Sequence, residues 1–378
     1  MKIAYVTLHW PRTKTSGIGK KMQRQIDTWR KSGHSVTCYM HLHNVEEQSN
    51  LVPAKYFFYY SAQSPLNLVK REITRSQALA ELITTVQHDE PDVIYLRWGM
   101  YANPLYKLFS KIPVVVEINT NDVREHRLLG FPLYLYNLLT RSITLRNASG
   151  LVFTTRELAA EPEFARFNTP RCVISNGIDL DAYQPLPAPH TPVPHLAFIG
   201  TPDLPWQGVE KLVSLAKMVT DIHIDIIGCS SLPGQEILPE NMTLHGYLGE
   251  EQYRQVLAKA SAAIGTLSLF KKGMQEAAPL KIRECAAYGI PLILPYRDSD
   301  LHDLNADTIL EISNTETNLQ KSATNIRDFL YSVAGKRLDH DLVNGLIDIT
   351  AKESARLKFF ETCITRQPEI ASGHPECH

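Results

Sequence analysis

The sequence predicts an α/β fold with two doubly wound parallel sheets, and three observations lead to this prediction. The chain has 378 residues, a length typical of about two domains. Short apolar runs rich in β-branched and aromatic residues alternate with longer amphipathic stretches, as strands and helices alternate around a parallel sheet. The alternation stops once, at residues 185–194, which contain five prolines, and then restarts. We therefore expect two similar halves.

The first half contains seven runs with the character of strands. Most of them are unbroken rather than alternating, which is typical of parallel strands that helices cover on both faces. The segment Gly19–Lys31 has Met22, Ile26 and Trp29 on one face, so we expect a helix there. The seven runs are residues 2–8, 35–41, 56–60, 92–98, 114–119, 150–155 and 172–176.

The second half contains six further runs, which follow the proline-rich segment. Proline fixes φ and favours an extended chain, so residues 185–194 are predicted to be a semi-rigid linker. The six runs are residues 195–200, 223–228, 242–246, 262–267, 291–296 and 308–312. The predicted divisions are 1–184, the linker 185–194, 195–335, and a helical part 336–378 that we expect to cross back onto the first domain. Open parallel sheets bind ligands at the carboxyl ends of their strands, so we expect the site in a cleft between two Rossmann-like domains.

The composition excludes some classes of partner. There are 39 Lys and Arg against 40 Asp and Glu, whereas a protein that mainly coats nucleic acid carries a basic excess. Six cysteines without a C-x-x-C pair favour a reduced, cytoplasmic protein. No apolar stretch approaches the ~18 residues of a membrane span. The last residues, 374–378, could ligate a metal or could be a frayed terminus.

The segment Gly273–Gly289 is the richest in chemistry. Its apolar residues have helical spacing from about residue 280, and the predicted helix ends at Gly289. Glu276 is expected in the loop before this helix and Glu284 within it. Backbone N–H groups at the start of the helix would suit a phosphate or sugar oxygen. The donor-binding residues expected there are Ala277, Ala278, Pro279 and Leu280, together with Lys281.

Several motifs in the right order resemble one enzyme family. E-x7-E followed by A-x-G-x-P begins at Glu276, SNGID (175–179) follows the last strand of the first half, a glycine loop (16–19) follows the first strand, and LHGYL (244–248) follows a later one. Together they resemble the retaining glycosyltransferases of family 4, in the branch that makes bacterial surface polysaccharides. The resemblance implies the GT-B architecture of two facing Rossmann-like domains.

The resemblance implies a role for each matching position on the donor side. Glu284 matches the glutamate that binds the ribose hydroxyls of the nucleotide sugar, and a carboxylate can accept from both. Glu276 matches the glutamate near the transferred sugar and the leaving phosphate. Gly17 and Gly19 match the loop whose backbone approaches the diphosphate. Tyr247 lies in the matching LHGYL element and is expected to contact the donor.

Three further residues are placed around the sugar and the acceptor. Asn119 stands where the family often has a histidine beside the donor sugar, which makes it a catalytic candidate with Glu276 and Lys281. Arg97, at the end of a strand, and Lys20 are expected on the acceptor side.

The chain departs from the family where many members have an Arg and a Lys that clamp the diphosphate. Thr201 and Gln207 stand at those positions. The leaving diphosphate still needs positive charge in the transition state. We favour Lys281 because it lies inside the glutamate motif. The candidates for this charge are Lys271, Lys272, Lys281 and Lys20, with the helix start at Pro279.

Each of these residues also has a purely structural interpretation. Lys271 and Lys272 could be a surface charge pair, and the glycine loop could simply form the turn from strand to helix. Arg97 could pair with a structural carboxylate such as Asp92. The segment 119–122 could be a helix cap, with Asp122 as the capping residue.

The implied reaction moves a sugar from a nucleotide diphosphate sugar, such as a UDP- or GDP-sugar, to a hydroxyl of a glycan or lipid-linked acceptor, with retention. Catalysis would then rest mainly on positioning and on stabilisation of the departing diphosphate, so we expect neither a metal nor another cofactor, and we expect no His/Asp cluster. Two alternatives keep the fold: a sugar-nucleotide 2-epimerase, and a non-catalytic protein that binds a sugar nucleotide. The lost Arg/Lys pair favours the second of these.

The segment 124–146 bears on the acceptor. It mixes many apolar residues with Arg124, Arg127, Arg141 and Arg146. A basic amphipathic face can lie on anionic lipid, so this segment could make peripheral contact with the inner face of a membrane. The alternative is a core helix with solvated arginines.

Overall fold

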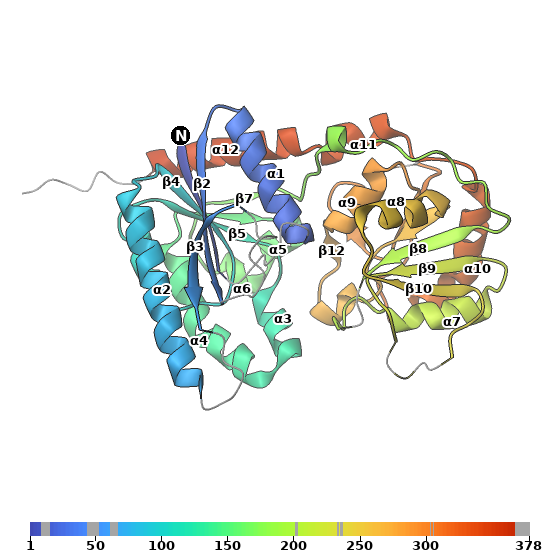
Figure 1. The fold of residues 1–378 in the computed structure, drawn as a ribbon, viewed down its shortest axis with the longest axis horizontal. Helices are drawn as coiled ribbons and strands as arrows, with labels where there is room; N and C mark the ends of the chain where they lie inside the picture. The colour runs from blue at the N-terminus through green and yellow to red at the C-terminus, as the bar shows by residue number, and fades with distance from the viewer. Residues whose placement is uncertain are drawn as a thin grey trace, which may run out of the picture. The chain divides into compact units, whose positions relative to one another are not determined.

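A computed structural model describes residues 1–8, 16–43, 53–60, 67–200, 203–232, 234, 237–302, 304 and 306–366. The chain divides into two compact units (Figure 1). The first unit consists of Met1–Phe153, Ala159–Ile174 and Glu353–His378. The second unit consists of Thr154–Leu158 and Ser175–Lys352.

The first unit is built on a seven-stranded parallel sheet with the order β3-β2-β1-β4-β5-β6-β7. Its order reverses beside β1, because β2 and β4 lie on opposite sides of that strand. Such a reversal is the point where doubly wound sheets bind ligands. The strands are β1 (Lys2–Leu8), β2 (Ser35–His43), β3 (Lys55–Tyr59), β4 (Val93–Arg97), β5 (Val114–Ile118), β6 (Gly150–Phe153) and β7 (Arg171–Val173).

Helices cover the first sheet. One core cluster joins the sheet to α1 and α12, and in it Trp29 packs edge-on against Phe360 at 5.5 Å between ring centroids. Trp29 Nε1 also donates to Glu353 Oε2 at 2.8 Å, which ties α1 to α12. The helices are α1 (Gly17–Lys31), α2 (Leu68–His88), η2 (Leu105–Phe109), α3 (Asp122–Leu129), α4 (Phe131–Asn147) and α6 (Pro162–Ala165). Two more, α5 (Arg156–Ala160) and α12 (Ile349–Thr365), start with residues of the second unit and end with residues of the first.

The second unit repeats the plan with a six-stranded parallel sheet of order β10-β9-β8-β11-β13-β15. The order reverses beside β8 as it does beside β1 in the first sheet. The strands are β8 (His195–Ile199), β9 (His223–Ile227), β10 (Met242–Gly246), β11 (Ala262–Ile264), β13 (Leu292–Leu294) and β15 (Ile309–Glu311), and a separate pair joins β12 (Glu276–Ala277) to β14 (Arg297–Asp298).

Two helical layers cover the second sheet. Along β8, Leu196 and Phe198 belong to the core cluster that includes Leu212 of α7, whereas Ala197 belongs to the cluster that includes Leu257 of α8. Successive side chains of a strand point to opposite faces, which explains this division. The helices are η3 (Leu180–Ala182), α7 (Glu210–Met218), α8 (Glu250–Lys259), η4 (Leu269–Lys272), α9 (Leu280–Ala287), α10 (Asn318–Ser332) and α11 (His340–Ile347).

The proline-rich run 185–194, predicted to be a linker, is held by the second unit. The Leu186 N–H donates to the Tyr288 carbonyl at 2.9 Å, and the Arg337 guanidinium donates to the Pro187 carbonyl at 2.7 Å. At Gly177, where the chain has just entered this unit, a Cβ atom would lie 2.8 Å from Ile349 Cα. The close approach of the two segments therefore requires glycine.

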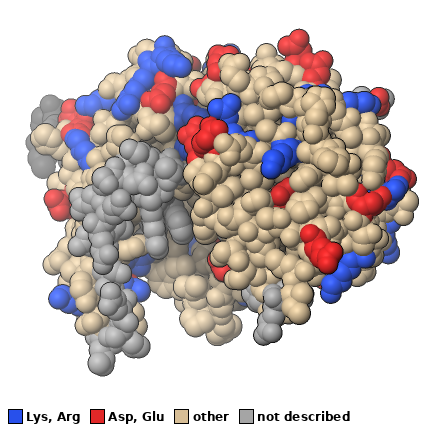
Figure 2. Space-filling view, turned by 45° about the vertical axis from the view of Figure 1, so that its right-hand side comes forward, with Lys and Arg blue, Asp and Glu red and all other residues tan. Residues whose placement is uncertain are grey.

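The predicted strands are all present, each within three residues of its expected ends. The short strands β12 and β14 were not predicted, so Glu276 lies in a strand rather than in a loop. On the face drawn in Figure 2, basic and acidic side chains are interspersed, in keeping with the balanced composition.

Candidate active site

Lys281 lies at the carboxyl end of β8, where the strand order of the second sheet reverses. Its Nζ donates to the carbonyl of Ile199, the last residue of β8, at 3.0 Å. A cavity of about 20 Å³ beside it is lined by the ends of β8 and β11 and by Pro279 and Ile282 from the start of α9. Doubly wound sheets bind nucleotides at this point, so Lys281 stands where a phosphate would be expected.

Burial sets the charge state of this lysine. Loss of hydration lowers the pKa of Lys281 to about 8, because a buried ammonium is less stable than a hydrated one. In the described part of the chain, no carboxylate lies within ion-pair distance of its Nζ. Lys281 is therefore a half-buried cation whose charge no carboxylate among the described residues offsets.

Glu284 lies within α9 as predicted, and its carboxylate is held by two phenols. Tyr183 Oη donates to Oε1 at 3.1 Å, and Tyr253 Oη donates to Oε2 at 3.2 Å. Both oxygens are therefore fixed in place.

Glu276 is buried and makes a reciprocal contact with the segment Thr154–Leu158 of the same unit. Its carboxylate accepts from the N–H of Arg156 at 3.3 Å and of Glu157 at 2.9 Å. The Glu157 carboxylate in turn accepts from the N–H of Glu276 at 2.7 Å. This pair of carboxylate-to-backbone contacts fixes the position of Glu276 at the edge of β12.

Arg283, which the sequence did not single out, braces the glutamate motif from inside α9. This fully buried side chain is 2.8 Å from Asp298 and 2.6 Å from Asp300, and its Nε donates to the Asn176 carbonyl at 3.2 Å. Asn176 Nδ2 donates to the Ala278 carbonyl at 2.7 Å. The SNGID element is therefore bonded directly to the glutamate motif. An arginine beside Glu284 inside an apolar helix was the only sequence signal for this contact.

The other basic candidates are engaged elsewhere. Lys271 Nζ lies 3.3 Å from Glu210 Oε1, and the Lys272 ammonium stands 4.5 Å above the Trp206 ring. Gln207 packs against Gly200 beyond the end of β8. Tyr247 is 84% exposed. Thr201 lies outside the described residues.

In the first unit, the predicted Arg97 and Asn119 are part of a buried ion network. Glu117 lies at its centre, with Lys21 Nζ at 2.8 Å from Oε1 and Arg97 Nη1 at 3.1 Å from Oε2. Asn119 bonds to Lys21 through Oδ1 and to Glu117 through Nδ2, both at 3.1 Å. Arg356 of α12 approaches Oε1 to 3.8 Å. The structural interpretation of Arg97 is confirmed in kind, because it pairs with a buried carboxylate, but the partner is Glu117 and not Asp92.

This network keeps Glu117 ionised. Burial alone would raise the pKa of this carboxyl, but Lys21, Arg97 and Arg356 hold it well below its ordinary range. Burial likewise lowers the pKa of Lys21 to about 8, although Glu117 opposes that shift. The charges in this network offset one another, as buried charges must.

The glycine loop differs in detail from its prediction. Ser16 caps α1 by accepting from the Gly19 N–H at 3.0 Å, so Gly17 and Gly19 form the first turn of the helix. Lys20 is exposed in the same turn. The expected cap at Asp122 was also wrong, since Asn121 caps α3.

Asp122 instead anchors α4, and this contact changes the interpretation of segment 124–146. Both carboxylate oxygens of Asp122 accept from the buried Arg141 guanidinium, at 2.7 and 2.8 Å. Arg124 pairs with Glu161 at 2.7 Å. The exposed side chains of the segment are mainly apolar, and the most exposed of them are Phe131 at 71% and Leu139 at 70%. The segment is therefore less basic and more apolar at its surface than expected. None of the helices in the described ranges is long and apolar enough to cross a bilayer.

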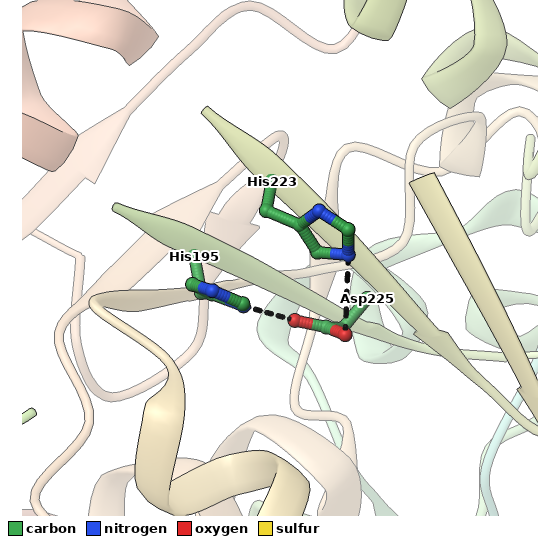
Figure 3. A group of neighbouring side chains, drawn as sticks. All are labelled: His195, His223 and Asp225. Carbon is green, nitrogen blue, oxygen red and sulfur yellow. Dashed lines mark hydrogen bonds and ion pairs between the residues drawn. The ribbon is translucent and has the colours of Figure 1, made fainter. Parts of the chain in front are cut away.

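The expectation that there is no His/Asp cluster was wrong, because strand pairing brings one together in the second unit. His195 and His223, the first residues of β8 and β9, lie against Asp225 (Figure 3). The sequence did contain one sign of this cluster. In the run His-Ile-Asp at 223–225, the first and third residues of a strand lie on the same face. This cluster is a potential metal-ligand set.

The fold resembles several solved structures, although no family model and no curated protein sequence matches the chain. Sucrose-phosphate synthase from Thermosynechococcus elongatus is 13% identical, with a TM-score of 0.65 over 97% of this chain and 100% of that chain. A glycosyltransferase from Rickettsia africae ESF-5 is 13% identical, with a TM-score of 0.68 over 97% and 99%. Anabaena HepE in complex with UDP and glucose is 12% identical, with a TM-score of 0.62 over 95% and 99%. Similarity along nearly the whole chain confirms the predicted fold class: the protein has the GT-B fold, with two Rossmann-like domains.

Proposed function

We propose that the protein is a retaining glycosyltransferase that moves a sugar from a nucleotide diphosphate sugar to a hydroxyl of a glycan or lipid-linked acceptor. The observation that carries the proposal is Lys281, a half-buried ammonium at the reversal point of the second sheet that meets no carboxylate of the described residues. Similar structures add support, because HepE was solved in complex with UDP-glucose and an alpha-glucosyltransferase in complex with UDP.

The donor would be held by groups that α9 and its surroundings position. Glu284, fixed by Tyr183 and Tyr253, offers two carboxylate oxygens to the ribose hydroxyls. Lys281 and the first turn of α9 face the diphosphate, where a helix start favours an anion. Arg283 keeps this helix in place through Asp298 and Asp300 without contacting the donor.

The reaction would depend on positioning and on charge stabilisation. As the sugar–phosphate bond breaks, negative charge grows on the diphosphate, and an ammonium placed there lowers the barrier. The acceptor hydroxyl attacks from the same face, and its proton passes to the leaving phosphate. Glu276 would orient the transferred sugar. The catalytic role of Asn119 stays a prediction. No step in this scheme needs a metal.

The first experiment is a thermal-shift panel with UDP, GDP, ADP and their sugars. A ligand that binds only the folded protein raises the melting temperature, so one nucleotide series should stand out. If no member of the panel shifts the transition, the proposed function is wrong. With the identified donor and an acceptor panel, the anomeric configuration of the product, measured by NMR, tests retention. Conversion of the donor to its C2 epimer without an acceptor would instead identify an epimerase, and binding without any turnover would identify a non-catalytic protein.

The exposed apolar side chains of α4 support a lipid-linked acceptor. A large exposed apolar patch usually marks a contact surface. Liposome flotation should show binding to anionic vesicles that falls in a Phe131→Ser/Leu139→Ser double variant. Ile237→Ser is the matched control, because Ile237 is 87% exposed in the second unit. Equal flotation of both variants, or none by the parent, would remove the membrane contact from the proposal.

A further inference from the structure

Polar side chains gather near the amino ends of β8 and β9 in the second sheet, at the opposite end of β8 from Lys281. The register pairs His195 of β8 with His223 of β9. Asp225 lies two residues after His223, and residues two apart on a strand share a face. Thr243 of β10 pairs with Asp225, and His245 follows two residues later. Three adjacent strands thus supply three imidazoles and one carboxylate to one face.

The imidazoles surround the carboxylate. His195 Nδ1 lies 2.6 Å from Asp225 Oδ2, and His223 Nε2 lies 3.8 Å from Oδ1 (Figure 3). His245 Nε2 lies 2.7 Å from the same Oδ1. Figure 3 shows His195 and His223 directed from neighbouring strands toward the two oxygens of Asp225.

We propose that His195, His223 and Asp225 form a binding site for a divalent transition metal such as Zn²⁺ or Fe²⁺. Their ligand atoms all lie within 4.8 Å of one another. Two imidazoles and one carboxylate suit these metals, with the remaining positions taken by water. Metal–ligand bonds of about 2.0–2.2 Å place tetrahedral ligand atoms about 3.3 Å apart. On metal binding, the 2.6 Å distance between His195 Nδ1 and Asp225 Oδ2 must therefore lengthen. The 3.8 Å distance between His223 Nε2 and Asp225 Oδ1 must shorten, and each change is less than ~1 Å.

The surroundings of the three ligands fit this role. His195 is 17% exposed and His223 is 24% exposed, so a metal can reach them from solvent. His245 would not bind the metal itself. It would hydrogen-bond to the Asp225 carboxylate, as neighbouring residues commonly do with carboxylates that bind a metal. Thr243 Oγ1 now bonds to His223 Nε2 at 2.9 Å, and metal binding would replace that hydrogen bond.

The position of the site separates it from the proposed reaction. His195 and His223 begin their strands, whereas Lys281 bonds to Ile199 at the opposite end of β8. Four residues of strand separate His195 from Ile199 by about 13 Å. A metal here would join β8 to β9 and stabilise the sheet, and it would take no part in sugar transfer.

The test uses the full chain with alanine at His374, Cys377 and His378, because those residues could bind metal themselves. The protein is stripped with a chelator and titrated with Zn²⁺ by calorimetry and with Co²⁺ by visible absorption. We expect one metal per chain, Co²⁺ bands typical of a site with nitrogen and oxygen ligands, and a higher melting temperature with Zn²⁺. His195→Ala and His223→Ala should each weaken binding by about 100-fold or more. His245→Ala should weaken it by about 10–100-fold.

The control variant is His88→Ala, since this imidazole is 89% exposed in the first unit, and it should leave binding unchanged. Circular dichroism of each metal-free variant checks that the fold is retained. The proposal is overturned if the parent binds neither metal, or if binding survives in both His195→Ala and His223→Ala.

Discussion

The two sheets of this protein share a strand order but treat buried charge differently at the carboxyl ends of their strands. In the first unit, Lys21 and Arg97 converge on Glu117, and Arg356 approaches from α12. In the second unit, Lys281 donates to the carbonyl of Ile199 and pairs with no carboxylate of the described chain. Burial lowers the pKa of both lysines to about 8.

The difference lies in what each charge does. Lys21 is offset by a carboxylate, so its charge is part of the folded core. Lys281 meets no carboxylate in the described part of the chain, and perturbed groups of this kind are common at functional sites. Lysines near the carboxyl ends of the strands are thus ion-paired in the first unit but not, among the described residues, at Lys281 in the second.

The largest expected effect comes from removing the carboxylate at the centre of the ion network in the first unit. Glu117→Gln keeps the shape of the side chain but leaves Lys21, Arg97 and Arg356 around a neutral group. Removing one partner of a buried ion pair costs about 3–5 kcal/mol. Urea denaturation followed by fluorescence should show this loss as an earlier unfolding transition. The matched control is Glu81→Gln, because Glu81 is exposed on α2 of the same unit. A loss no greater than that of the control would mean that the network does not stabilise the first unit.

The next effect concerns turnover rather than stability. Lys281→Met keeps the buried aliphatic stem and removes the ammonium. Loss of one group that stabilises transition-state charge lowers kcat by about 10²–10³-fold. Steady-state transfer assays measure this, with circular dichroism to check folding and Lys217→Met, an exposed lysine of α7, as the control. If Lys281→Met retains the kcat of the parent, the contrast between the two lysines has no catalytic meaning.

The sequence predicted the strands well because unbroken apolar runs depend on local residues alone. It could not distinguish Lys21 from Lys281, because the partner of Lys21 lies 96 residues away and is set by how β5 and α1 meet. Arg283 was missed for the same reason, since Asp298, Asp300 and Asn176 come from other segments. Asp122 was predicted to cap a helix because the sequence spacing does not predict its ion pair with the buried Arg141, which is 19 residues away. The His195–Asp225 contact likewise depends on the pairing of two strands.

The smallest expected effect is the uptake of a proton by Lys281 when the donor binds, which would distinguish Lys281 from Lys21. With a pKa of about 8, roughly half of the free protein carries a neutral amine at pH 8, by definition of the pKa. A bound diphosphate favours the charged form and raises this pKa, so binding at pH 8 should take up about half a proton. Below pH 7 the lysine is already charged and the uptake should vanish. As the pH rises above 8, donor affinity should fall by up to about tenfold per unit, because the bound state holds one more proton than the free state.

Calorimetry in buffers with different ionisation enthalpies measures this uptake, with the nucleotide sugar as the ligand because its diphosphate has no group that titrates near pH 8. Lys281→Met should bind more weakly and take up no proton. Lys21 has a similar pKa but should contribute nothing, since Glu117 already offsets its charge with and without donor. Proton uptake that persists in Lys281→Met would assign it to another group and would remove the distinction between the two lysines.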